Sequence, residues 1–313
     1  MKIDDYTHTP VLLEEVLDGL AIRSDGFYVD ATFGRGGHSL AILQRLNQQG
    51  RLLVFDKDPD SVKIAKRFAS EDDRFGFVHA PFSDIQEHIV KEGKLGAVNG
   101  ILFDLGMSSP QLDKPERGFS FSRDGDLDMR MNPDTGTSAS DWINAAKENE
   151  IVRVLRDYGE ERFARRIAKK IVEYRTEKQI NRTAQLAELI VSAVPFREKE
   201  KHPATRSFQA IRIFINDELG ELRQALKQVN SILTPGGRLA VISFHSLEDR
   251  IVKRYMREES LGDDYPQDLP VTASQLHPRM KIIGKAIKPG AKEIENNPRA
   301  RSAVLRFAEK LAA

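Results

Sequence analysis

The chain has 313 residues, of which 40% are hydrophobic and 30% charged. This balance is typical of a soluble globular protein that buries a large core. Cysteine is absent, which excludes disulfides, cysteine-ligated zinc, iron–sulfur clusters and thiol nucleophiles. The first residues are too polar for a signal peptide, and no apolar run approaches the length of a membrane span. We therefore expect a cytoplasmic protein with no membrane partner.

The net charge of +1 hides two basic stretches. Residues 153–212 contain 15 Lys/Arg against 8 Asp/Glu, and residues 279–310 contain 9 against 3. Basic stretches on an otherwise acidic protein favour a polyanionic partner that meets part of the surface. Solvated helix faces give the same pattern, so charge alone leaves both interpretations open.

Apolar runs alternate with helical periodicity along the first hundred residues. Thr9-Pro10 predicts the start of a helix that ends near Gly19. The elements predicted next are strands over 27–31, 52–56, 75–79 and 98–105, with helices over 37–47, over 59–69 and from about 84. This alternation predicts a parallel sheet with helices on both faces.

The alternation stops after the fourth strand. Residues 111–204 contain a Gly/Asp/Arg-rich loop and then helical spacing, without a strand pattern. A helix over 208–233 and a Thr-Pro-Gly-Gly turn lead into a fifth strand over 238–244, followed by a helix from 247 and strands over 281–286 and 303–307. We therefore predict a discontinuous α/β core, 1–110 and 205–313. The helical insertion domain, 111–204, is expected to recognise the substrate.

A glycine-rich turn follows the first predicted strand and holds Gly34, Gly36 and Gly37. Glycines at such a junction let the backbone approach a ligand beside a helix N-terminus. Asp56 lies 19 residues after Gly37, at the tip of the second strand, where a carboxylate can accept hydrogen bonds from ribose hydroxyls. Both features predict a nucleotide-like cofactor.

Two cofactor classes fit this pattern, and the spacing separates them. The dinucleotide fingerprint requires a third glycine where this chain has Ser39. The acidic-x-G-x-G-x-G pattern of methyltransferases matches from Asp30 to Gly36, with Thr32 in place of the first glycine. We therefore predict a Rossmann-like class I methyltransferase core that binds S-adenosylmethionine, and disfavour an NAD-dependent oxidoreductase.

The third strand leads to Phe82 and Asp84. Phe82 is positioned to face the adenine ring and Asp84 to accept from its amino group. Core packing of Phe82 and helix capping by Asp84 are the structural alternatives.

The fourth strand ends at Asp104, followed by Ser108-Ser109-Pro110-Gln111. Asp104 is expected at the ligand edge of the sheet, near the positive charge of the cofactor. The Ser-Ser-Pro segment resembles the Ser-Pro-Pro-aromatic motif of enzymes that methylate exocyclic amino groups of cytosine or adenine. We predict that Asp104, Ser108, Ser109 and Pro110 form the catalytic site.

Gln111 stands where that motif has an aromatic residue that stacks on the base. We expect Phe119, Phe121 or Phe244 to stack instead. Because cytosine C5 methylation normally requires a cysteine nucleophile, transfer to nitrogen or oxygen remains.

The remaining signals are weaker. Asp124, Asp126 and Asp128 resemble the start of an EF-hand loop, but its glycine and glutamate positions hold Met129 and Thr135, so no metal site is predicted. His245 fits either a catalytic or a structural role. The cations expected to reach RNA phosphates are Arg117, Arg123 and Arg130 in the loop and Arg162, Arg165, Arg166, Lys169 and Lys170 along one helix.

Together the motifs resemble the MraW/RsmH methyltransferases of 16S ribosomal RNA. The resemblance spans nearly the whole chain in order. It rests on residues 8–12, 30–39, 104–113, 117–121, 127–131, 201–206, 208–213 and 243–250, the last being Ser-Phe-His-Ser-Leu-Glu-Asp-Arg.

The resemblance implies N4-methylation of a cytidine in the decoding centre of the small ribosomal subunit. It implies cofactor contacts at Gly36, Gly37, His38, Asp56, Phe82, Asp104 and Gln111. Two alternatives are a DNA amino-methyltransferase, which the Ser-Ser-Pro segment alone would favour, and a non-catalytic RNA-binding factor of ribosome assembly.

Overall fold

The fold was analysed in a computed structural model, in which residues 10–195, 202–263 and 276–312 are described. The chain forms two compact units. Unit 1 comprises Met1–Gly106 and Leu219–Ala313, and unit 2 comprises Met107–Glu218. No helix within the described ranges is long and apolar enough to cross a membrane.

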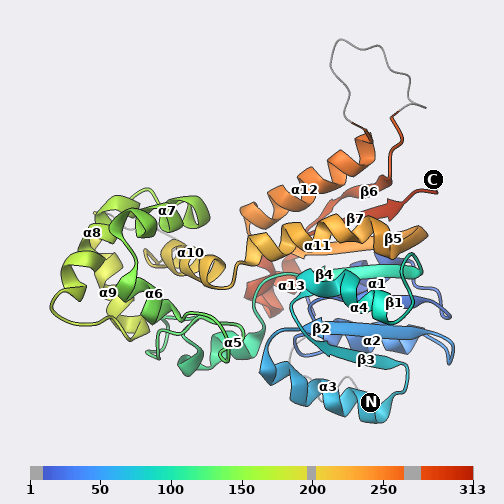
Figure 1. The fold of residues 1–313 in the computed structure, drawn as a ribbon, viewed down its shortest axis with the longest axis horizontal. Helices are drawn as coiled ribbons and strands as arrows, with labels where there is room; N and C mark the ends of the chain where they lie inside the picture. The colour runs from blue at the N-terminus through green and yellow to red at the C-terminus, as the bar shows by residue number, and fades with distance from the viewer. Residues whose placement is uncertain (1–9, 196–201, 264–275, 313) are drawn as a thin grey trace. The chain divides into compact units, whose positions relative to one another are not determined.

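Unit 1 is built on a seven-stranded sheet with the order β3-β2-β1-β4-β5-β7-β6 (Figure 1). Its strands are β1 Phe27–Asp30, β2 Arg51–Asp56, β3 Phe75–His79, β4 Val98–Asp104, β5 Leu233–Ser243, β6 Met280–Ile287 and β7 Val304–Lys310. The first five are mutually parallel, whereas β7 runs antiparallel to both β5 and β6. The predicted parallel α/β sheet is confirmed.

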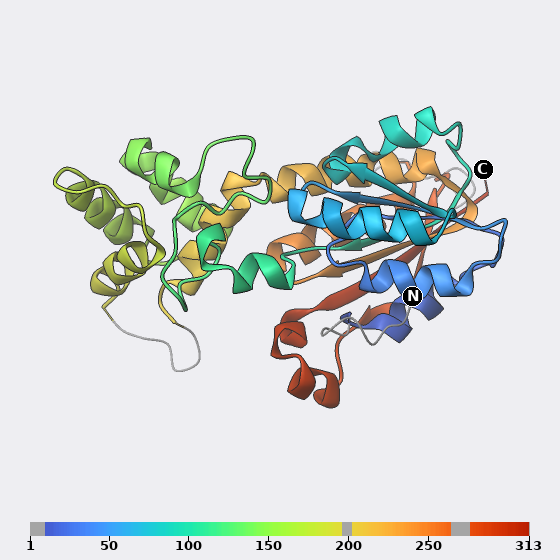
Figure 2. The ribbon, with the colours of Figure 1, turned by 90° about the horizontal axis from the view of Figure 1, so that it is seen from below.

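Helices cover both faces of this sheet (Figure 2). On one face, α1 Leu13–Leu20, α2 Gly37–Arg45 and α3 Pro59–Glu71 share a core with Tyr28, Val54 and Ile242. On the other face, α4 Ile85–Lys91, α11 Glu218–Ile232 and α12 Ser246–Leu261 pack on Val29 and Phe103. Because neighbouring strand residues point to opposite faces, these strands are apolar throughout and buried on both sides. Shorter pieces complete the unit: η2 Phe82–Asp84, α13 Ala291–Asn296 and η5 Pro298–Ser302.

Unit 2 is helical and has its own hydrophobic core. Its elements are α5 Ser109–Asp113, η3 Pro115–Arg117, α6 Ala139–Ala145, α7 Glu148–Gly159, α8 Ala164–Arg175, α9 Thr183–Ala193 and α10 Thr205–Ile215. These elements follow β4 and precede β5 in the chain. Unit 2 extends through α10, although the sequence predicts this helix in the α/β core. Phe208 and Ile211 of α10 pack in the core of unit 2.

Several element ends differ from those predicted, and three of the differences change the description of the chain. The helix predicted over 208–233 is two helices, because Asp217 adopts a left-handed conformation (φ +46°) between α10 and α11. The first helix begins at Leu13, after Leu12 in the left-handed region, and Thr9 lies outside the described residues. β5 begins at Leu233, so the predicted turn is an irregularity within the strand.

Candidate functional site

Three aspartates end neighbouring strands at the carboxyl edge of the sheet. Asp30 ends β1, Asp56 ends β2 and Asp104 ends β4. Because β1 lies between β2 and β4, the three residues share the edge at which open parallel sheets bind ligands. We call them the strand-end aspartates.

The turn from β1 to α2 depends on its glycines. Gly34 and Gly36 have left-handed φ values of +54° and +79°, and a Cβ on Gly36 would lie 2.8 Å from the rings of Phe33 and Phe68. A Cβ on Gly37, the first residue of α2, would lie 2.4 Å from Pro10. The turn therefore brings bare backbone to a helix N-terminus, as phosphate and nucleotide sites do.

Asp30 stabilises this turn through hydrogen bonds that its side chain accepts. Its carboxylate is buried and accepts hydrogen bonds from the Ser39 hydroxyl (2.6 Å) and the Thr32 amide (3.1 Å). Burial raises the pKa of Asp30 to about 6, against the lowering effect of the Ser39 bond. Ser39, which stands where the dinucleotide fingerprint has its third glycine, thus has a structural role as the hydrogen-bond donor to Asp30.

Asp56 joins the tip of β2 to the same turn. One carboxylate oxygen accepts from the Gly34 amide (2.8 Å) and the Ser61 hydroxyl (2.7 Å), and the other accepts from the Asp58 amide (2.8 Å). Burial raises the pKa of Asp56. Since a carboxylate offers about four acceptor positions, one remains for a ligand hydroxyl, as the predicted ribose contact requires.

Asp104 is the least satisfied of the strand-end aspartates. Its amide donates to the Thr32 hydroxyl (2.6 Å), and its Oδ2 lies 3.5 Å from Nδ1 of His38. Within the described residues, its buried Oδ1 has no hydrogen-bond partner. Burial, with smaller effects from the charges of Asp30 and Glu248, raises the pKa of Asp104 to about 8.

His38 is held in one tautomer. Its Nε2 lies 3.1 Å from the Val11 carbonyl oxygen, which can only accept, so Nε2 carries the proton and Nδ1 is left as an acceptor. Burial lowers the pKa of His38 to about 4. The histidine is therefore neutral and contributes no positive charge to Asp104.

These features fit a cationic ligand at Asp104. A buried carboxylate oxygen without a partner is costly, and the Asp104 side chain is 27% exposed, so a ligand can reach it. A ligand with an ammonium or sulfonium group would supply the missing positive charge. The predicted cofactor residues Gly34, Gly36, Gly37, His38 and Asp56 lie in the same turn and strand ends.

Phe82 lies in η2, after β3, and is half-buried. Its ring meets Phe103 edge-on, with the centroids 5.6 Å apart, so core packing accounts for part of its surface. Asp84 precedes α4, but its side chain makes no capping bond and accepts from the Ser83 hydroxyl (3.1 Å). Its predicted contact with an adenine amino group remains a prediction.

The Ser-Ser-Pro-Gln segment begins α5 in unit 2. Ser108 is the N-cap, Ser109 and Pro110 open the helix, and Gln111 forms a capping box with Ser108. The Gln111 side-chain oxygen accepts from the Ser108 amide at 2.9 Å. Gln111 is 5% exposed. The capping box holds this segment in one conformation, and the predicted roles of its residues in cofactor binding and catalysis remain predictions.

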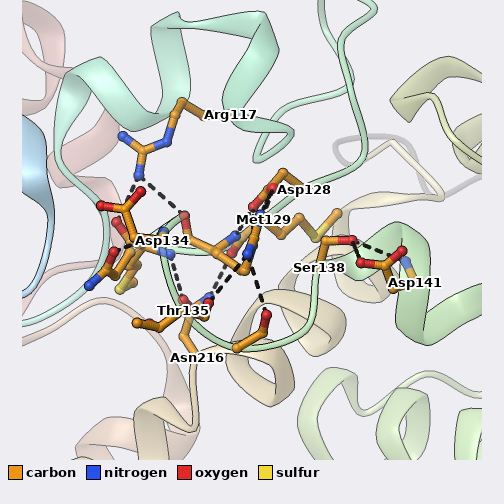
Figure 3. Close-up of polar contacts among 12 residues, drawn as sticks. Arg117, Asp128, Met129, Asp134, Thr135, Ser138, Asp141 and Asn216 are labelled. Carbon is orange, nitrogen blue, oxygen red and sulfur yellow. Dashed lines mark hydrogen bonds and ion pairs between the residues drawn. The ribbon is translucent and has the colours of Figure 1, made fainter.

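The 117–138 loop of unit 2 is ordered by its own polar contacts (Figure 3). Arg117 is buried and donates to the carbonyls of Arg130 and Met131. Asn216, after α10, accepts from the Met131 amide (2.7 Å) and donates to the Met129 carbonyl (2.8 Å). Met129 itself has a left-handed φ of +61°.

The loop's charged residues are mostly engaged within unit 2. Arg130 pairs with Asp128 (2.6 Å), and Arg182 pairs with Asp124 (2.9 Å) and Asp126 (2.7 Å). Of the three loop arginines expected to reach phosphates, Arg123 alone is exposed without such a pairing in the described chain. The aspartates that resembled a calcium loop thus bind arginines.

The aromatic residues considered for base stacking have different surroundings. Phe119 is buried with Arg117 over its ring (5.8 Å). Phe121 is half-buried and contacts the exposed His202 ring, 4.6 Å between centroids. Phe244, in unit 1, packs close to Gly106.

Glu248 is a residue that the sequence analysis missed. It is 2% exposed, and its carboxylate accepts from the amides of Phe244 (2.7 Å) and His245 (3.2 Å) while raising the pKa of Asp104. Its position three residues after His245 is the signal of a capping box. His245 begins α12 as the N-cap of that box, which is the structural role considered for it.

A family comparison agrees with this geometry. The model of the MraW methylase family matches residues 5–311. The chain belongs to the MraW methylase family. It is therefore a methyltransferase, and its cofactor is S-adenosylmethionine. The resemblance drawn from the motifs is confirmed.

Three solved structures are similar to this chain at low sequence identity. An rRNA methylase from Clostridium thermocellum is 11% identical (TM-score 0.45), covering 97% of this chain and 98% of that one. An rRNA methylase from Streptococcus thermophilus is 12% identical (TM-score 0.43), covering 98% and 99%. A Streptococcus mutans methyltransferase in complex with SAH is 12% identical (TM-score 0.43), covering 97% and 100%. Matches at this level carry no inference about substrate.

Proposed function

We propose that this MraW family member methylates the N4 amino group of a cytidine in 16S rRNA, in the decoding centre of the small ribosomal subunit. The observation that carries the proposal is Asp104, whose buried Oδ1 has no partner in the described chain. It ends β4 at the ligand edge, and the chain continues into the Ser108–Gln111 segment of an amino-methylating motif. The family's activity supplies the particular base.

The chain's residues support transfer to an amino nitrogen. When bound, S-adenosylmethionine would supply a methyl group on a positively charged sulfur, and the S–C bond would break with both its electrons going to sulfur as the amino nitrogen takes the methyl group. Asp104 in its ionised form stabilises positive charge at the carboxyl end of β4. The chain has no cysteine, so the covalent route to cytosine C5 is closed.

Orientation is expected to supply much of the acceleration. The lone pair of the cytosine amino group is conjugated into the ring, so it must be turned and desolvated before it attacks. The Ser108–Gln111 capping box fixes the backbone of the segment expected to hold that amino group. One amino proton is released to water as the product forms.

Charge favours a nucleic-acid substrate, and the family resemblance favours RNA over DNA. The five cations predicted to reach phosphates from this helix are exposed along or beside α8, namely Arg162, Arg165, Arg166, Lys169 and Lys170. Among the described residues, only Lys169 of these has an acidic partner, Glu173, at 3.8 Å. Exposed cations on one helix match a phosphate backbone.

The test is methyl transfer from labelled S-adenosylmethionine to small ribosomal subunits that lack the modification, and to naked 16S rRNA. Digestion and mass spectrometry would show N4-methylcytidine at one site. Label in double-stranded DNA, with none in RNA, would favour a DNA amino-methyltransferase. Cofactor binding without transfer to either polymer would favour a non-catalytic assembly factor.

A further inference from the structure

A basic segment lies at the same edge of the sheet as the strand-end aspartates. The ladder places Asp104 opposite Ile242, Ile242 opposite Leu305, and Leu305 opposite Ile287, the last residue of β6. Asp104 and Ile287 are therefore three strand spacings of about 4.8 Å apart, or roughly 14 Å. The segment after Ile287 therefore begins at the ligand edge.

Hydrogen bonds connect the segment that follows Ile287 to the residues beside the glycine-rich turn between β1 and α2. In α13, Glu293 accepts from the Leu12 amide at 2.8 Å, while the neighbouring Val11 carbonyl accepts from His38. Ala300 of η5 is buried in the core that contains α1 and α2. Figure 2 shows α13 and η5, in dark red, beside the first described residues of the chain. The segment is thus fixed to unit 1.

Its cations face solvent. Lys288, Lys292 and Arg301 are exposed, and none has an ion pair within the part of the chain that the structure describes. By contrast, Arg306 in β7 pairs with Asp249 (2.7 Å). The acidic residues among them are exposed Glu295 and half-buried Glu293, which accepts from the Leu12 amide. We call Lys288, Lys292 and Arg301 the basic rim.

We infer that the basic rim binds backbone phosphates of the substrate RNA beside the target nucleotide, an inference that rests on the proposed function. The distance from Asp104 to the start of the rim is one that a few nucleotides span. The strand-end aspartates make the cofactor site acidic, as a cationic cofactor requires. Because they repel phosphates, the RNA backbone needs a separate basic surface. A segment fixed to the core holds the cations in register with the site.

The chain supplies a matched control. Lys94, Lys227 and Lys281 are also exposed, without an ion pair in the described ranges. Lys281 is on β6, the strand that leads to the rim, but lies opposite Glu309. Glu309 itself lies opposite Arg238 at the far end of the sheet. Lys94 precedes β4 and Lys227 lies toward the end of α11, so both also lie toward the far end.

The experiment compares two charge-reversed variants of the full chain, Lys288→Glu/Lys292→Glu/Arg301→Glu and Lys94→Glu/Lys227→Glu/Lys281→Glu. Each changes the net charge equally. Methyl transfer to 16S rRNA or subunits is measured against RNA and salt concentration, and S-adenosylmethionine binding by calorimetry. The rim variant should raise KM for RNA on the order of ten- to a hundredfold and leave cofactor affinity unchanged.

The salt dependence gives a second readout. Each phosphate contact with single-stranded RNA contributes about 0.7 to the slope of log affinity against log salt, so the rim variant should lose roughly 2 from that slope. The milder Lys288→Gln/Lys292→Gln/Arg301→Gln variant covers the case in which charge reversal impairs folding. Equal KM and slope in rim and control variants would overturn the inference while the proposed function stands. A wild-type protein that methylates no RNA would overturn both.

Discussion

The strand-end aspartates of unit 1 and the 117–138 loop of unit 2 both contain several charged side chains, but they differ in whether those side chains have partners. In the loop, Arg130 has Asp128 as its partner and Arg117 has two backbone carbonyls. At the strand ends, acidic groups gather without a cation: Asp104 has a neutral histidine and an unpartnered oxygen. A satisfied network stabilises a conformation, whereas a buried carboxyl oxygen without a partner indicates a missing ligand.

The largest expected effect comes from Asp104→Asn. The substitution keeps the shape but removes the negative charge, so methyl transfer should fall on the order of 10²–10³-fold. Folding should not suffer, because the carboxylate has no strong partner to lose in the ligand-free protein. Turnover is measured with labelled cofactor and folding by thermal denaturation.

Asp18→Asn is the control for that substitution, since Asp18 lies on α1 away from the strand ends. Wild-type turnover in Asp104→Asn would contradict the proposed site. A strong loss of stability in Asp104→Asn would instead show that the carboxylate is structural, as in the loop.

Asn216→Ala tests the other side of the comparison. It leaves the Met131 amide and the Met129 carbonyl without their partner, which should cost about 1–3 kcal/mol in the free energy of unfolding. S-adenosylmethionine affinity should not change. Denaturant titration and calorimetry measure the two quantities.

Asn132→Ala is the matched control in the same loop, because its side chain accepts a single bond from the exposed Asp134 amide. Its effect should be much smaller. If the two asparagine variants are equally stable, the loop is not held by Asn216.

The sequence predicted unit 1 better than unit 2, for a physical reason. Strand periodicity and the glycine turn are local patterns, and the parallel sheet brings Asp30, Asp56 and Asp104 to one edge without further information. The contacts of Asn216 with Met129 and Met131 join residues far apart in the chain. No spacing rule predicts them.

The break at Asp217 was missed for a related reason. Residues 205–232 are helical in composition on both sides of it, and a single left-handed residue that is not glycine leaves little trace in the sequence. This error does not affect the prediction for Gly34, Gly36, Gly37, Asp56 and Asp104, because all five lie in unit 1 and precede unit 2 in the chain. Glu248 was missed because its spacing from His245 indicates only a helix cap. Its effect on Asp104 depends on the tertiary fold.

The pH dependence of stability should also distinguish the two regions. The folded-state pKa of Asp104, about 8, is above its unfolded value, so the folded protein holds an extra proton between these values. The resulting stability is complete below the unfolded pKa and is lost as the pH rises toward 8. His38, with its pKa lowered to about 4, has the opposite effect below about 6.5.

A window from about pH 6.5 to 8.5 therefore isolates Asp104 from His38. The melting temperature of ligand-free wild-type protein should fall on the order of 5 °C across it, and Asp104→Asn should flatten the profile. An equal fall in that variant would place the titrating group elsewhere.

The smallest expected effect is that of Arg182→Ala. Arg182 pairs with Asp124 and Asp126, but its side chain is 43% exposed, and solvent screens exposed ion pairs. The melting temperature should fall by about 2 °C or less, while Asn216→Ala in the same unit causes a larger fall. A loss as large as that of Asn216→Ala would mean that the exposed ion pairs hold the loop. The distinction between the regions would then rest on Asp104 alone, since charge pairing rather than buried backbone bonding would stabilise unit 2.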